Sequence, residues 1–187
     1  MHKMRIYIVR HGETKENLQR ILQGHLPGTL TVKGQEQVRQ TAERLAKEGA
    51  EPDGASGKWT RIVSSDLKRA MDSALIIADR LHLPITPMEI LRERDWGQFT
   101  GMAIAEATDR FRIDGRWQFP PGTTETEEGI YERAGKALRA LKQMFGDETL
   151  IVVTHGQLAR NLIAAHFGCS YHEVTPFANA EIRTIDI

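Results

Sequence analysis

The stretch Ile6-Tyr7-Ile8-Val9-Arg10-His11-Gly12 does most to decide how this chain folds. Its first four residues form a short apolar run rich in β-branched side chains, which is typical of a buried strand. The run stops at Arg10 and His11, so the strand carries two polar side chains at its carboxyl end. The same design recurs in Ile62-Val63-Ser64-Ser65 and in Leu150-Ile151-Val152-Val153-Thr154-His155-Gly156.

Helix-like sequence follows each of these strands. After Ser65 the apolar residues are spaced by three and four as far as about Leu81, before Pro84. Further helices are predicted from a Thr31 cap to Gly49, over 127–145, and over 157–167 with Gly168 as the stop. A last strand is expected around Ile182, and the stretches 51–58 and 115–124 are expected to be loops.

Alternation of strands and helices favours a mostly parallel central sheet between two helical layers, a three-layer α/β/α sandwich. Ligands of such sheets bind beyond the carboxyl ends of the strands.

Composition excludes several other classes of function. The chain has 25 Lys and Arg against 25 Asp and Glu, so its overall charge favours neither nucleic acid nor a membrane surface. Its single cysteine, Cys169, allows no intramolecular disulfide and no Cys-based metal site. No apolar stretch is long enough to cross a bilayer, and we expect a cytoplasmic protein.

Four cationic or ionisable residues converge if the sheet is parallel. Arg10 and His11 end the first strand, Arg69 lies at the start of the helix after the second, and His155 ends the third. Each alone would be interpreted as a packing or surface residue. Together they form a concentrated cationic site, which would be costly to bury without an anion and suits a dianionic phosphate.

The local sequences then indicate a family. Arg10-His11-Gly12-Glu13-Thr14 resembles the signature of the histidine phosphatases, the superfamily that includes the cofactor-dependent phosphoglycerate mutases. Four further segments agree with it in order: Gly34-Gln35-Glu36-Gln37, Ser64-Ser65-Asp66-Leu67-Lys68-Arg69-Ala70, Leu91-Arg92-Glu93-Arg94-Asp95-Trp96-Gly97 and Thr154-His155-Gly156. The resemblance runs from Met4 to about Ile182 and implies one domain, 1–187, with a phosphoglycerate mutase-like fold.

The resemblance also implies roles for individual residues. His11 corresponds to the nucleophile that becomes phosphorylated, and Arg10, Arg69 and His155 correspond to the groups that hold the phosphoryl. Glu93 corresponds to the proton donor, although Glu13 and Asp95 are rival carboxylates. The resemblance further places Asn17, Gln23 and Gly24 along the phosphate pocket, where capping of a helix or loop is an alternative.

No metal or other cofactor is expected, because the chain lacks a metal-binding motif and the chemistry needs none. The side chains of Trp96, Trp117 and Phe119 could form apolar contacts with an organic group of the substrate, or they could simply pack within the protein.

Two segments depart from the family pattern. Gly24-His25-Leu26-Pro27-Gly28-Thr29-Leu30-Thr31 has Pro27 and Thr29 where many relatives have Asp and Pro, which leaves the shape of that loop open. Glu125 matches a Gly-Glu-Ser element only loosely, and we assign it no catalytic role.

The short segment between Gly101 and Gly122 favours a phosphatase. Mutases of the family carry a longer insertion there that shields phosphohistidine from water, and an open pocket should favour hydrolysis. The substrate is expected to be a small organic phosphate ester.

A phosphoglycerate mutase stays open because Arg110, Arg112 and Arg116 could bind a second anionic group. An α-ribazole phosphatase, a non-catalytic phosphate-binding module and a homodimer also stay open.

Overall fold

The structure is a computed structural model that describes residues 4–49 and 59–187, so the connector expected at 51–58 lies outside the described residues. Its main sheet has five strands in the order β3-β2-β6-β1-β7, and the first four are parallel. The strand bounds are β1 Arg5–Arg10, β2 Arg61–Ser64, β3 Ile85–Pro87, β6 Leu150–Thr154 and β7 Ile182–Asp186. The expected last strand, β7, runs antiparallel to β1.

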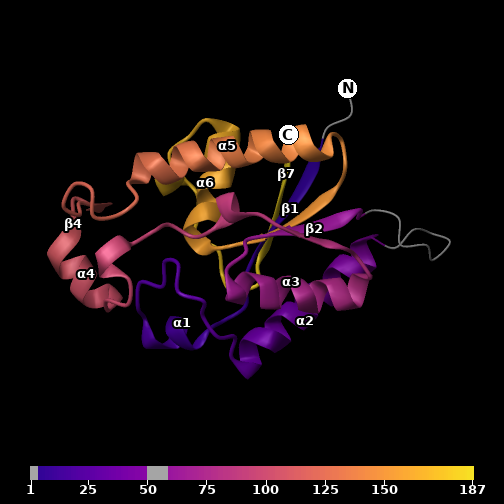
Figure 1. Cartoon of the computed structure of the whole chain (residues 1–187), viewed down its shortest axis with the longest axis horizontal. Coiled ribbons are helices and arrows are strands. Elements are labelled where there is room, and N and C mark those ends of the chain that lie inside the picture. The colour runs from indigo at the N-terminus through magenta and orange to yellow at the C-terminus, as the bar shows by residue number, and fades with distance from the viewer. Residues whose placement is uncertain (1–3, 50–58) are drawn as a thin grey trace.

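Two pairs of helices cover the two faces of this sheet (Figure 1). One pair is α2, Val32–Gly49, with α3, Lys68–Leu81, and the other is α5, Glu127–Phe145, with α6, Gly156–Phe167. All four helices agree with the sequence-based predictions, including the Thr31 cap, whose hydroxyl accepts a hydrogen bond from Gly34 N at 2.9 Å. The predicted three-layer α/β/α architecture is therefore confirmed.

Alternation along the strands divides the core between the two layers. Ile6, Ile8 and Val152 pack toward α5 and α6, whereas Tyr7 and Val9 pack toward α2 and α3. Because both faces are covered, the central strands are apolar throughout, as the sequence suggested. Burial of both layers fixes the register and with it the level at which each strand ends.

The prediction for 115–124 as a loop was only partly correct. Arg112–Ile113 and Arg116–Trp117 pair as a small hairpin, β4 and β5, next to the helix α4, Ile104–Phe111. Four aromatic residues of this region, Trp96, Phe99, Trp117 and Phe119, pack with Leu22 into a separate small core. The predictions also lacked α1, Lys15–Gln19, the edge strand β3 and three single-turn 3-10 helices.

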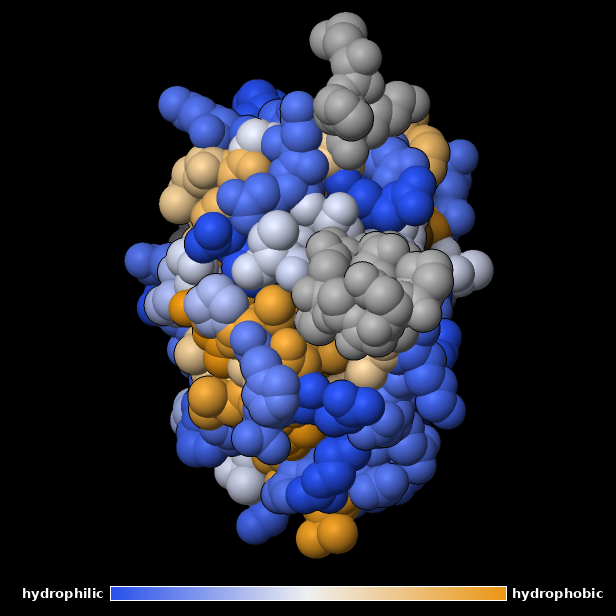
Figure 2. All heavy atoms as spheres, turned by 90° about the vertical axis from the view of Figure 1, so that its right-hand side faces the viewer, coloured by the Kyte–Doolittle hydropathy of each residue, from blue (hydrophilic) through white to orange (hydrophobic). Residues whose placement is uncertain are grey.

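Figure 2 views the end of the molecule at which β2 begins, away from the carboxyl ends of the parallel strands. Hydrophilic side chains dominate this face and surround a smaller apolar area. In the described part of the chain, no helix combines the length and apolar character needed to cross a membrane.

Candidate active site

The register of the sheet brings the predicted site residues to one level. Arg10 pairs with Thr154, and Ser64 pairs with Val153, so β1, β2 and β6 end side by side. The next residue of each strand is His11, Ser65 or His155, and all three are buried. The rings of His11 and His155 lie 5.2 Å apart between centroids. The predicted convergence of the two histidines is confirmed.

His11 is held as a neutral imidazole with its unprotonated nitrogen facing Arg69. Its Nδ1 lies 2.7 Å from the carbonyl oxygen of Gly12, which can only accept, so Nδ1 carries the proton. Nε2 is then unprotonated and accepts from Arg69 Nε at 3.3 Å. Burial, followed by the charges of Arg69 and Arg10, holds the pKa of His11 well below 6.5.

Arg69 links His11 to the loop that follows α1. Its guanidinium donates to the carbonyls of Leu26 and Gly24, the latter at 2.9 Å, as well as to His11. Burial lowers the pKa of this guanidinium to about 10, so it remains a cation at neutral pH. The side chain is 1% exposed, and its charge is therefore felt at short range in a poorly solvated site.

Two nitrogens on this rim are buried without a hydrogen-bond partner among the described residues. Arg10 donates from Nη1 to the Phe177 carbonyl at 2.6 Å, but its Nε has no partner. His155 contacts Ser65 Oγ through Nε2 at 2.8 Å, but its Nδ1 has none. Buried polar groups are normally paired, so these two nitrogens indicate that the site takes a ligand rich in acceptors.

Glycines allow helix α2 to support the catalytic loop closely. A Cβ on Gly34 would lie 2.0 Å from the Glu13 carbonyl oxygen, and one on Gly12 would lie 2.4 Å from the Gly34 carbonyl oxygen. One turn further along α2, Gln37 accepts from Glu13 N at 3.0 Å. The Gly-x-x-Gln element thus fixes the backbone that follows His11.

Of the three carboxylates considered as proton donor, Glu93 is the one whose charge acts on both Arg10 and Arg69. It accepts from the backbone amides of Gln157 and Leu158, immediately after His155, and from Arg94 N at 2.9 Å. None of the neighbouring arginines is its ion-pair partner. Arg92 pairs with Asp66 and Glu89, and Arg94 donates to the Glu125 carbonyl.

The two rival carboxylates are engaged elsewhere. Glu13 bonds Thr31 and Lys33 at the start of α2, and these contacts lower its pKa. Asp95 accepts from Gly97 N at 2.8 Å. This arrangement favours Glu93 over Glu13 and Asp95.

Asn17 has its amide orientation fixed by three donor contacts. Its Oδ1 lies 3.0 Å from Thr14 N, 3.1 Å from Thr14 Oγ1 and 3.2 Å from Asn179 Nδ2. Asn17 is therefore a helix-capping residue, as the alternative interpretation held, and its Nδ2 is left to donate elsewhere.

Gln23 and Gly24 lie on the adjoining loop. Gln23 is buried, with Oε1 3.1 Å from Thr14 Oγ1, and Gly24 has a positive φ of 47° and bonds Arg69 through its carbonyl. Gly24 also lies against Trp96, because a Cβ there would be 3.2 Å from that ring. Trp96, Trp117 and Phe119 pack on one another, with ring centroids 5.6 to 5.7 Å apart.

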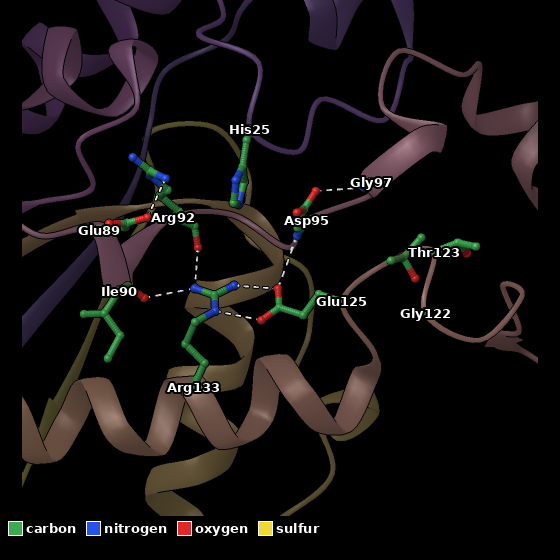
Figure 3. A pocket seen from close by; sticks show the side chains of 11 residues that line it. His25, Glu89, Ile90, Arg92, Asp95, Gly97, Gly122, Thr123, Glu125 and Arg133 are labelled. Atoms are coloured by element: carbon green, nitrogen blue, oxygen red, sulfur yellow. Dashed lines mark hydrogen bonds and ion pairs between the residues drawn. The ribbon is translucent and has the colours of Figure 1, made fainter.

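A pocket of about 570 Å³ opens beside the segment that carries Glu93 (Figure 3). His25 lies at one side of it, and the paired side chains of Glu125 and Arg133 lie at the other. Within residues 4–49 and 59–187, no group of three or more His, Cys, Asp and Glu side chains is arranged to hold a metal ion.

With this geometry established, comparison with known proteins settles the family. Residues 6–187 match the model of the histidine phosphatase superfamily, branch 1. The chain belongs to the histidine phosphatase superfamily. The resemblance predicted from its motifs is thereby confirmed.

The similar proteins include some that are named as mutases and some that are named as phosphatases. The chain is 36% identical to phosphoglycerate mutase-like protein 4 of Arabidopsis thaliana, over 84% of this chain and 68% of that protein. It is 34% identical to the uncharacterized phosphatase PhoE of Bacillus subtilis, over 84% and 75% respectively. A solved mycobacterial glucosyl-3-phosphoglycerate phosphatase in complex with VO3 superposes with a TM-score of 0.82 at 27% identity, covering 97% of this chain and 92% of that one.

Sequence reasoning missed several residues that shape this histidine phosphatase site. Ser65 lay inside a quoted motif, yet its contact with His155 follows only from the strand register. Asn179 bonds both the His11 carbonyl and Asn17 from far along the chain, and no local pattern marks it. Arg133 contacts the segment around Glu93 from a helix whose periodicity shows only its apolar face.

Proposed function

We propose that this chain is a phosphomonoester phosphatase that works through a phosphorylated His11 and needs no metal ion. The observation that carries the proposal is the unprotonated Nε2 of His11 on the same rim as two buried nitrogens, Arg10 Nε and His155 Nδ1, that have no hydrogen-bond partner. A phosphoryl group supplies three acceptor oxygens and a centre that Nε2 can attack.

In the first step the Nε2 lone pair of His11 forms a bond to phosphorus as the ester P–O bond breaks. Glu93 gives its proton to the departing alkoxide, so an alcohol leaves. The Nδ1–H donates to the Gly12 carbonyl, and this hydrogen bond strengthens as the ring gains positive charge. Arg10, Arg69 and His155 stabilise the charge on the transferring oxygens, which is the main task in phosphoryl transfer.

In the second step water attacks the phosphohistidine and Glu93 takes its proton. The P–N bond breaks, inorganic phosphate leaves, and His11 returns to its neutral form. The position of Glu93 at the start of α6, beside His155, suits both proton transfers. The cations of the protein supply the positive charge that a divalent metal provides in other phosphatases, and this supports a metal-independent reaction.

The substrate class is a small organic phosphate ester. The likeness to proteins named phosphoserine phosphatase, 32% identical, and glucosyl-3-phosphoglycerate phosphatase, 32% identical, supports hydrolysis as the reaction. The short segment between Gly101 and Gly122 is largely occupied by its own aromatic core, and Arg110 is paired with Glu106. These features leave less cationic surface for holding a second phosphate as a mutase must.

The test is release of inorganic phosphate from a panel of phosphomonoesters in EDTA. The panel includes 3-phosphoglycerate, 2,3-bisphosphoglycerate, phosphoserine and α-ribazole phosphate, with product isomers checked. Net phosphate release in EDTA is the expected result. Isomerisation of phosphoglycerate without net release would replace this proposal with a mutase, and binding of phosphate without turnover would indicate a non-catalytic phosphate-binding module.

A further inference from the structure

An ion pair between Arg133 on helix α5 and Glu125, two residues before that helix, contacts the backbone around Glu93. We propose that Arg133 and Glu125 are positioning residues that hold Glu93 at the reacting oxygen, and that their loss impairs proton donation more than phosphoryl binding. This inference rests on the proposed function, since it assigns a role relative to Glu93 as the proton donor.

Arg133 makes the central contacts. Its Nη1 donates to the carbonyls of Ile90 and Arg92 at 2.9 and 2.7 Å, and its Nη2 donates to the carbonyl of Glu93 at 3.2 Å. Figure 3 shows the guanidinium lying directly beneath this segment. Three carbonyls in one short segment are thus held by a single planar cation, and the segment has no regular secondary structure after the single-turn 3-10 helix Glu89–Leu91.

Glu125 completes the grip from the other side. Its two carboxylate oxygens bind Nε and Nη2 of Arg133 at 2.7 Å each, and Oε2 also accepts from Asp95 N at 3.2 Å. Its backbone carbonyl accepts from Arg94 Nε at 2.9 Å. The pair therefore fixes backbone atoms on both sides of Glu93 as well as its own carbonyl.

The Glu93 side chain is in turn aimed by helix α6, through the amides of Gln157 and Leu158. The backbone of Glu93 is thus held from α5, and its carboxylate is held from α6. Within the described residues, no hydrogen bond or ion pair joins Arg133 or Glu125 to His11 or to the phosphate donors, and both side chains line the pocket of Figure 3. Their loss should shift Glu93 and leave the phosphoryl-binding groups in place.

This predicts a selective effect on substrates with poor leaving groups. The p-nitrophenolate ion is a stable leaving group that needs little help from an acid, whereas unsubstituted phenolate and alkoxide ions need a proton in the transition state. Misplacing a catalytic group by about 1 Å costs on the order of 100-fold. We expect Arg133→Lys and Glu125→Gln to lower kcat/KM, which reports formation of the phosphohistidine, by roughly 10- to 100-fold for phenyl and alkyl phosphates, and to change kcat/KM for p-nitrophenyl phosphate little.

The experiment measures kcat and KM over a series of phosphate esters for the wild type, Glu93→Gln, Arg133→Lys, Glu125→Gln and Glu93→Gln combined with Arg133→Lys. The matched control is Arg61→Met, which breaks another partly buried Arg–Glu pair, with Glu148 at 3.0 Å. Arg61 begins β2, at the opposite end of the strand from the site. Arg61→Met should leave the dependence of activity on the leaving group unchanged. Melting curves show whether each variant is folded. Because Arg133→Lys and Glu125→Gln test the same ion pair, the inference can still be tested if one of the two variants fails to fold.

The expected result is that Arg133→Lys and Glu125→Gln each reproduce the leaving-group dependence of Glu93→Gln. The double variant should lose no more activity than Glu93→Gln alone. If folded Arg133→Lys or Glu125→Gln lost activity equally on all esters, or lost none, the inference would be overturned. If Glu93→Gln itself showed no dependence on the leaving group, the fault would lie in the proposed proton donor, and the positioning role would fall with it.

Discussion

Gly34→Ala tests whether helix α2 holds the catalytic loop in place. In the structure a Cβ at Gly34 would lie 2.0 Å from the Glu13 carbonyl oxygen and 2.8 Å from Glu13 N, where real Cβ contacts stay above 3.0 Å. The two backbones must therefore separate by about 1 Å, and the bond from Glu13 N to Gln37 is strained with them. His11 lies two residues before Glu13 and shares this displacement.

The size of the effect follows from that displacement. A shift of about 1 Å in a catalytic group costs on the order of 100-fold in kcat. Forcing a methyl group into a packed contact costs about 1 to 3 kcal/mol of stability, offset by up to about 1 kcal/mol from the better helix propensity of alanine. We expect a large loss of phosphatase activity with a modest fall in melting temperature.

Gly135→Ala is the matched control, because it places the same methyl group in another helix with room for it. The nearest atom to a Cβ at Gly135 is Arg139 Nη1 at 3.5 Å. This variant should be stabilised by about 0.5 to 1 kcal/mol with unchanged kcat. The assays are initial rates with p-nitrophenyl phosphate and thermal melts. Wild-type kcat in a folded Gly34→Ala variant would refute the argument that this contact positions His11.

Three further predictions follow from the buried groups of the site. Burial and the nearby arginines hold the pKa of His11 and of His155 well below 6.5, so the unfolded chain binds more protons than the folded one once the pH falls below about 6.5. The free energy of unfolding, measured in urea, should then decrease by up to about 1.4 kcal/mol per pH unit for each histidine, and His155→Gln should reduce this slope. Vanadate or phosphate at 100 times its Kd should stabilise the protein by about 2.7 kcal/mol, which raises the melting temperature by about 5 to 10 °C, and His155→Gln should reduce that shift. Ser65→Ala should lower kcat by roughly tenfold and the free energy of unfolding by about 1 to 3 kcal/mol, since it removes the partner of His155 Nε2 and of Leu67 N.

The framework was predictable because strong local patterns and packing agreed. Ile6–Val9 and Leu150–Val153 are apolar and β-branched and have to be buried on both faces, and the helix stops at Gly49 and Gly168 are marked by glycine. The convergence of His11 and His155 followed from parallel strands of similar length. Once the sheet was predicted to be mostly parallel, the positions of these two histidines at one edge of it followed.

What could not be predicted depends on contacts between distant segments. The hairpin at Arg112–Trp117 has only two residues in each strand, and it is supported by the aromatic core around Trp96 and Phe119. Sequence periodicity over so short a stretch carries little information. The contact of Asn179 with Asn17 and the grip of Arg133 on the carbonyls around Glu93 likewise depend on tertiary approach.

Trapping the phosphorylated enzyme tests the central claim most directly. Enzyme is mixed with a radiolabelled phosphate ester in EDTA, quenched within a turnover, digested under alkaline conditions and mapped. We predict an acid-labile, base-stable phosphoryl group on His11 that forms and decays at least as fast as kcat, and no label in His11→Ala. Full turnover without label on His11, or label on another residue, would contradict the account.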